Sequence, residues 1–205
     1  MKILNLYAGL GGNRQSWDGH YITAIESDPD IAKLYKELYP NDTVLVADAH
    51  EFLLKNHKFY DFIWSSPPCQ SHSQMIRSGK NRKPRYPDMR LYEEIILLTH
   101  DFDGEWVVEN VMPYYTPMFN AFRKGRHLFW SSLNLGGLQV PDSPEEFINS
   151  TTVDGAEGLK EWLGIHYEGN IYYGDNHCPA QVLRNCVHPI VGEQIMNMVI
   201  RKTHE

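Results

Sequence analysis

The chain has 205 residues, of which 42% are apolar and 22% are charged, and its formal net charge is −7 at pH 7. This composition is typical of an ordinary soluble globular protein and excludes a disordered or fibrous chain. The length corresponds to one domain, or to one domain with a small appendage. The acidic balance argues against a protein that coats nucleic acid without specificity.

The N-terminus and the cysteines indicate the compartment. No run of 18 apolar residues occurs, and no long apolar segment precedes the glycines of MKILNLYAGLGG, so we expect neither a membrane span nor a secretion signal. Three cysteines without CxxC spacing favour a reducing compartment over a disulfide framework. The expected location is the cytoplasm.

Strand-like and helix-like patterns alternate over the first two-thirds of the chain. Strands are predicted at 2–7, 21–26, 43–48, 59–65, 104–111 and 126–132, and helices at 29–38, at 88–100, around 157–163 and from 189 onward. Asp28 and Pro29 supply an N-cap and a proline at the first position of one helix. Strands separated by helices indicate an α/β fold with a mostly parallel sheet and helices on both faces.

A glycine-rich segment follows the first predicted strand. Glycines in Tyr7-Ala8-Gly9-Leu10-Gly11-Gly12 let the backbone pass close to a ligand and turn sharply. Glu26 ends the second strand, where a carboxylate can accept both ribose hydroxyls of an adenosine cofactor. Asp48 ends the third strand, close to the expected adenine edge. The glycines alone are also typical of a tight turn, but together with the two acids they favour an adenosine-type cofactor.

The sequence SSPPCQSHSQ at 65–74 places a cysteine, Cys69, directly after a Pro-Pro pair. Because ligands of an open α/β sheet lie outside the carboxyl ends of its strands, this thiol is predicted to lie at the same edge as the glycines. Glu109 ends the fifth strand at that edge. It is either a carboxylate satisfied by backbone amides or a carboxyl group that binds a base.

A basic segment follows the cysteine. Six basic side chains and one acidic side chain lie between Arg77 and Arg90. They indicate either a solvated loop or the site of one focused anionic partner, and their position after Cys69 favours the partner. Arg123, Lys124 and Arg126 flank the sixth strand as a phosphate site or a surface cluster.

Together these motifs resemble the DNA cytosine-C5 methyltransferases, over residues 3–199 and in the family's order. The glycine segment is similar to the cofactor loop, with Glu26 and Asp48 at the ribose and adenine positions. Pro68-Cys69-Gln70 resembles the nucleophile motif, Asp88-Met89-Arg90 the D-x-R, and Glu109-Asn110-Val111 the Glu-Asn-Val. Arg126 resembles the last arginine of Q-x-R-x-R, and Asn185-Cys186-Val187-His188-Pro189 the closing motif. Compact phage-encoded members are the most similar in extent.

The resemblance implies a Rossmann-like S-adenosylmethionine-dependent methyltransferase sheet with a small recognition appendage. Residues 1–132 and 184–205 would form the catalytic domain, and 133–183 a reduced target-recognition region. The sequence departs from the family at Arg184 and Cys186 in the closing motif, at Phe122 and Lys124 in the arginine motif, and at Ser71-His72-Ser73 in place of Gly-Phe-Ser.

The resemblance also implies roles for residues. Cys69 would add to C6 of cytosine as a thiolate, Glu109 would bond the N3 and amino edge, and Arg126 would favour the thiolate. Cofactor contacts are expected from Tyr7, Ala8, Gly9, Gly11, Gly12, Glu26, Ser27, Asp48, Ala49, Pro67, Asn185 and Val187. Nucleic-acid contacts are expected from Gln70, Ser73, Arg77, Lys80, Arg82, Lys83, Arg85 and Lys124.

The implied partner is double-stranded DNA with a flipped cytosine, in a bacterial cell, with a phage or prophage as a candidate source and restriction-modification as a candidate role. No metal is expected. The pairs His177-Cys178 and Cys186-x-His188 are poorly spaced for zinc, and a core cysteine with loop histidines is favoured. Tyr172-Tyr173 is predicted to pack in the core. The alternatives are methylation of RNA or of a free pyrimidine nucleotide, and an inactive DNA-binding paralogue.

Overall fold

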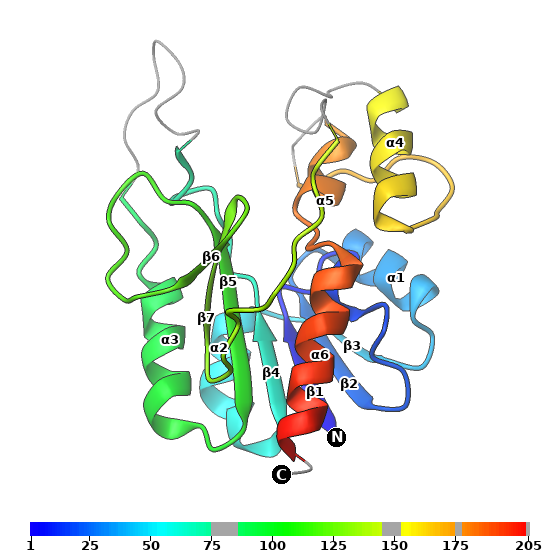
Figure 1. Cartoon of the computed structure of the whole chain (residues 1–205). Coiled ribbons are helices and arrows are strands. Elements are labelled where there is room, and N and C mark those ends of the chain that lie inside the picture. The colour runs from blue at the N-terminus through cyan, green and yellow to red at the C-terminus, as the bar shows by residue number, and fades with distance from the viewer. Residues whose placement is uncertain (75–85, 145–152, 175–177, 204–205) are drawn as a thin grey trace.

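The computed structural model describes residues 1–74, 86–144, 153–174 and 178–203 (Figure 1). Its seven strands are β1 (Lys2–Leu6), β2 (Tyr21–Glu26), β3 (Thr43–Val46), β4 (Phe62–Ser65), β5 (Glu105–Val111), β6 (Phe122–Lys124) and β7 (His127–Ser131). Its helices are α1 (Pro29–Leu38), α2 (Ala49–Asn56), α3 (Arg90–Asp101), α4 (Val153–Leu163), α5 (Ala180–Arg184) and α6 (Pro189–Thr203), with short 3-10 helices η1 (Gly12–Arg14) and η2 (His57–Phe59).

The strands form one sheet in the order β3-β2-β1-β4-β5-β7-β6. The first five pair in parallel, and β7 is antiparallel to both β5 and β6. The mostly parallel sheet expected from the alternating pattern is therefore confirmed. Its order reverses direction at β1, so β1 and β4 are the central pair, where ligands of such sheets bind.

Helices cover both faces of the sheet (Figure 1). On one face, α6 packs Val191, Ile195 and Val199 against strand residues such as Ile3 and Phe62. On the other face, α2 and α3 pack their apolar sides against the opposite side chains of β1, β4 and β5. Alternate strand residues thus enter two separate cores, as the two-residue period of a strand requires.

The region after β7 contributes to two cores. Leu133, Leu135 and Leu138 belong to the same core as α6 and the sheet. The helices α4 and α5 instead build a third core with Leu10 and Ile31, above the carboxyl ends of the strands in Figure 1. The appendage therefore rests on the glycine segment and on α1.

Besides the two 3-10 helices, three elements have no counterpart among the predicted ones. The helix α2 begins where Asp48 accepts a hydrogen bond of 2.9 Å from the backbone N–H of Glu51, an N-cap at the end of the third strand. The strand β6 has only three residues, and α5 has five. Both are too short for a periodic pattern to identify.

Candidate active site

One cavity of about 210 Å³ lies outside the carboxyl ends of β1, β2, β4 and β5. Thirteen of the predicted site residues line it: Tyr7, Ala8, Gly9, Gly12, Glu26, Pro67, Cys69, Gln70, Ser73, Glu109, Arg126, Asn185 and Val187. They come from five strand ends and from the segment between α5 and α6. The fold therefore brings together residues more than 170 positions apart in the chain.

The glycine segment is built for close approach. Gly9 has φ +53° and faces open space, since a Cβ built there would meet no atom within 4 Å. Its N–H donates a hydrogen bond of 2.9 Å to Glu26 Oε2, which ties the ends of β1 and β2 together. At Gly12 a Cβ would lie 2.4 Å from the carbonyl oxygen of Val187, so the closing motif packs directly onto the glycine backbone.

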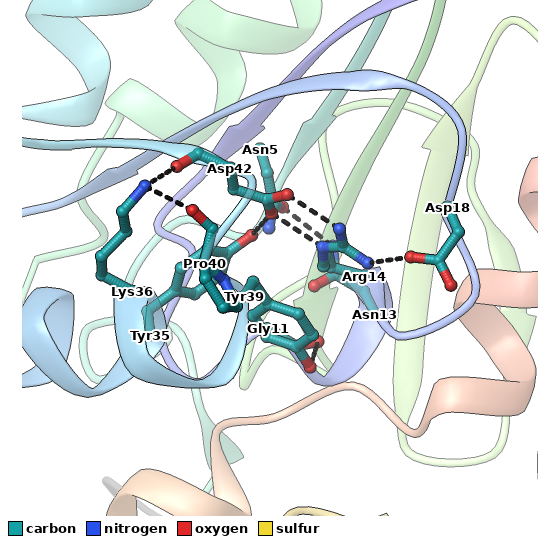
Figure 2. A network of polar contacts seen from close by, with 10 residues as sticks. All are labelled: Asn5, Gly11, Asn13, Arg14, Asp18, Tyr35, Lys36, Tyr39, Pro40 and Asp42. Atoms are coloured by element: carbon teal, nitrogen blue, oxygen red, sulfur yellow. Dashed lines mark hydrogen bonds and ion pairs between the residues drawn. The ribbon is translucent and has the colours of Figure 1, made fainter.

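A buried polar network lies between the glycine segment and α1 (Figure 2). Arg14 in η1 donates two hydrogen bonds of 2.7 and 2.8 Å to Asp42, and both side chains are almost fully buried. The hydroxyl of Tyr35 donates to the same carboxylate at 2.9 Å. Tyr39 donates from its hydroxyl to the carbonyl of Gly11 at 2.9 Å. The network thus fixes the backbone of the glycine segment against α1.

The loop that carries Cys69 is held at both ends. The amide of Asn110 donates a hydrogen bond of 2.9 Å to the carbonyl of Pro67. After the cysteine, the N–H groups of His72 and Ser73 both donate to the Cys69 carbonyl at 3.0 Å. Two prolines and these three hydrogen bonds leave the thiol in a defined position on the cavity wall.

The electrostatic environment of Cys69 differs from the one expected. Burial raises the pKa of the thiol, the Glu109 carboxylate raises it further, and Arg126 lowers it. The net direction is upward, so burial and Glu109 outweigh the cation. The guanidinium is itself buried, and it donates to the carbonyl of Arg184 at 3.0 Å. Arg126 therefore limits the rise in the pKa of Cys69 that burial and Glu109 cause.

Two of the cavity residues outside the predicted set have titratable side chains beside predicted carboxylates. His127, the first residue of β7, is hydrogen-bonded through Nδ1 to Glu109 Oε1. Tyr173, from the segment between α4 and α5, lies beside the side chains of Glu26 and Ser27. The only sequence signal for His127 is its place next to Arg126. The prediction that Tyr172 and Tyr173 both pack in the core is wrong for Tyr172, which is 42% exposed.

The other predicted residues that the structure describes do not line the cavity. Gly11 faces Tyr35 and Tyr39, Ser27 follows Glu26, and Ala49, the first residue of α2, is buried. Asp48 caps α2 and pairs with Arg90 at 3.3 Å. Lys124 donates to the carbonyl of Gly136 at 2.6 Å. The predicted nucleic-acid residues Arg77, Lys80, Arg82, Lys83 and Arg85 lie outside the described residues.

The departure at Ser71-His72-Ser73 has a structural reason. His72 is 1% exposed, and its Nδ1 lies 2.5 Å from the hydroxyl of Tyr115, which in turn accepts from the hydroxyl of Tyr92 at 3.2 Å. Burial lowers the pKa of His72, so the ring is neutral there. A polar chain between the nucleophile loop and α3 thus stands where the family has an aromatic side chain.

Among the residues that the structure describes, no three His, Cys, Asp or Glu side chains are arranged to hold a metal ion. Cys186 is buried, which raises the pKa of its thiol to about 12; His177 of the candidate zinc pairs is outside the described residues. None of the helices described has the length and apolar character needed to cross a bilayer.

The sheet order, the glycine segment and the acidic end of β2 define the Rossmann-like fold of S-adenosylmethionine-dependent methyltransferases. Residues 1–120 match the family model of the C-5 cytosine-specific DNA methylases, and the chain belongs to this family. S-adenosylmethionine is accordingly its cofactor.

Relatives extend the comparison. The type II methyltransferase M1.HphI of Haemophilus parahaemolyticus is 26% identical over 127 residues, which are 57% of this chain and 34% of that protein. A tRNA (cytosine(38)-C(5))-methyltransferase of Spodoptera frugiperda is 28% identical over 110 residues, 50% of this chain and 32% of that protein. The chain thus spans about a third of the length of these curated relatives. A crystal structure of a Spodoptera frugiperda DNMT2 mutant matches the fold with a TM-score of 0.53 and 14% identity, covering 97% of this chain and 99% of that one.

Proposed function

We propose that the chain transfers a methyl group from S-adenosylmethionine to C5 of cytosine in DNA through a covalent bond between Cys69 and C6. The observation that supports this most is the single cavity shared by Cys69, Glu109 and the glycine segment. The proposed nucleophile, the proposed base-binding carboxyl group and the proposed cofactor-binding backbone all line this cavity, which supports a site for one cofactor and one base.

The cavity fits the cofactor. Gly9 leaves open space at the cavity wall, where no side chain blocks the backbone. Glu26 is 2% exposed and lies beside that glycine, which suits a carboxylate that accepts ribose hydroxyls. Gly9, Glu26, Asn185 and Val187 would hold the cofactor. When bound, the cofactor supplies an electrophilic methyl group.

The residues of the chain would then activate the base. The Cys69 thiolate adds to C6, because C5 of cytosine alone is a weak nucleophile, and the ring gains electron density at C5. Glu109 would hold the N3 and amino edge, where negative charge develops during this addition. Arg126 would offset the raised pKa of Cys69. Loss of the C5 proton after methylation releases the thiol.

DNA is the proposed substrate because the matching family model describes C-5 cytosine-specific DNA methylases. The target base would leave the helical stack to reach Cys69 in a cavity. Residues 133–183 would serve as a reduced target-recognition region beside that cavity. A role in restriction-modification or in a phage would use this same methyl transfer. RNA is the second candidate, because the other curated relative acts on cytosine 38 of tRNA.

The test is methyl transfer from labelled S-adenosylmethionine to duplex DNA, single-stranded DNA, tRNA and dCMP. We expect label in DNA that Cys69→Ala abolishes while cofactor binding is kept. Cys178→Ser is the matched control, because this cysteine does not line the cavity. Label confined to tRNA would replace DNA by RNA as the substrate. Methylation of DNA by Cys69→Ala would exclude the covalent mechanism.

A further inference from the structure

We propose that His127 is a positioning residue that keeps a proton on Glu109 for delivery to N3 of the target base. This inference rests on the proposed function and concerns a side chain that the family motifs do not include. It starts from the hydrogen bond between His127 Nδ1 and Glu109 Oε1.

The sheet register places this contact. The strands β5 and β7 are antiparallel, with Val111 opposite His127 and Glu109 opposite Phe129. Glu109 and His127 are therefore diagonal neighbours, a spacing that an imidazole and a carboxyl group can bridge. The ring of His127 stacks on Phe129 with an interplanar angle of 29°, and Phe129 is 1% exposed. The imidazole is thus fixed by a rigid core residue.

The chemistry of Glu109 requires a proton at this point. N3 of cytosine is a hydrogen-bond acceptor, and an ionised carboxylate has no proton to donate to it. A protonated Glu109 can donate to N3, and the imidazole at Oε1 is a group that can supply that proton. Glu109 and His127 have side-chain exposures of 7% and 13%, so exchange with bulk water is restricted.

His127 also reaches a second cavity. It lines both the active-site cavity and an adjacent cavity of about 140 Å³. Charged and titratable groups around it are Cys69, Arg126 and Arg184 in the first cavity, Asp142 and His188 in the second, and Lys124 opposite it on β6. The imidazole therefore stands between Glu109 and an adjacent cavity that Asp142 also lines.

The proton movements balance the covalent step. As the S–C6 bond forms, the C5=C6 pair moves to C4–C5 and the C4=N3 pair moves to N3. N3 takes the proton that Glu109 and His127 share, delivered from the Glu109 carboxyl group, which leaves a Glu109 carboxylate and a neutral imidazole. When the thiol leaves after loss of the C5 proton, N3 returns its proton by the same route.

The test is the pH dependence of single-turnover methylation by His127→Gln and His127→Ala. At high pH the rate falls when the Glu109–His127 pair loses its shared proton. Without the imidazole, Glu109 must hold this proton alone, so we expect the high-pH limb to move to lower pH. The rate at pH 8 should fall roughly tenfold to a hundredfold. Imidazole added to His127→Ala should restore part of the rate.

The control is His166→Gln, since His166 is exposed and lines neither of the two cavities. It should keep the wild-type profile. A uniform loss of rate in both His127 variants, with an unmoved high-pH limb and no rescue, would overturn the inference. Trapping on 5-fluorocytosine DNA or RNA separates the two proposals: a wild-type protein that forms no Cys69 adduct on either would overturn the proposed function itself.

Discussion

The side-chain amide of Asn110 donates a hydrogen bond of 2.9 Å to the backbone carbonyl of Pro67. This contact joins the end of β5 to the loop that carries Cys69, two residues further on. Because Glu109 directly precedes Asn110, one short segment sets both the carboxyl group and the thiol. The distance between the two proposed reacting groups therefore depends in part on this buried amide.

Removing this amide should separate the two groups. We expect Asn110→Ala to lower the rate of methyl transfer by roughly tenfold to a hundredfold, because small displacements of reacting groups are costly. Binding of S-adenosylmethionine, measured by calorimetry, should change little, since the glycine segment is held by other contacts. Gln74→Ala is a control on the same loop, at an exposed residue that does not line the cavity. Equal rates for Asn110→Ala and wild type would show that the loop keeps its position without the amide.

The buried thiol predicts a pH dependence. Because burial and Glu109 raise the pKa of Cys69, the thiolate fraction at neutral pH is smaller than for a free cysteine, and it grows as pH rises. The rate of alkylation of Cys69 by iodoacetamide should therefore still be rising above the ordinary thiol range of about 8.5.

Arg126 opposes that increase, so Arg126→Gln should move the alkylation midpoint to still higher pH. Arg123→Gln is the matched control, since this exposed arginine on β6 does not line the cavity. A midpoint that stays unchanged in Arg126→Gln, measured by mass spectrometry of the Cys69 peptide, would contradict the role of Arg126 near the thiol.

The sequence predicts the sheet because its signals are local. The apolar runs, the N-cap at Asp28 and the glycines of the first turn each act within a few residues, and the predicted strands match β1 to β5 and β7 within a few residues at their ends. Strand ends of a parallel sheet meet at one edge, so the shared location of Glu26, Cys69 and Glu109 followed from the same pattern.

The contacts that complete the site are not local. Tyr173 reaches Glu26 across almost 150 residues, through a region whose own pattern is irregular. His127 meets Glu109 only because β7 runs antiparallel to β5. The upward shift in the pKa of Cys69 likewise depends on how deeply the thiol is buried. Such features depend on the packing of distant segments, which a short motif does not encode.

The position of Tyr173 indicates that the segment between α4 and α5 contributes to cofactor binding. Tyr173 lies beside Glu26 and Ser27, and the neighbouring Gly174 N–H donates to Asp28 at 3.4 Å. We expect Tyr173→Phe to weaken binding of S-adenosylmethionine about two- to tenfold, as for one hydrogen bond of about 0.5–1.5 kcal/mol. Tyr172→Phe, at an exposed neighbour, should bind as wild type does. If both variants bind equally well, the appendage does not contribute to the cofactor site.

The buried pair of Arg14 and Asp42 predicts a large effect on stability (Figure 2). The side chains are 7% and 2% exposed, so removing one partner leaves the other charge buried without compensation. We expect Asp42→Ala to lower the free energy of unfolding by about 3–5 kcal/mol in urea titrations. The variant should also bind S-adenosylmethionine more weakly, since Tyr35 packs against Gly11 and donates to the same carboxylate.

Arg14 offers its own control, because it also pairs with Asp18 at 3.1 Å, and the Asp18 side chain is 87% exposed. Water screens that pair, so Asp18→Ala should cost less than about 1 kcal/mol. The double variant Arg14→Met with Asp42→Ala should recover part of the loss of Asp42→Ala, because it removes the uncompensated guanidinium. Full recovery is not expected, since the Tyr35 hydroxyl loses its acceptor. Equal losses for Asp42→Ala and Asp18→Ala would show that burial does not set the strength of these contacts.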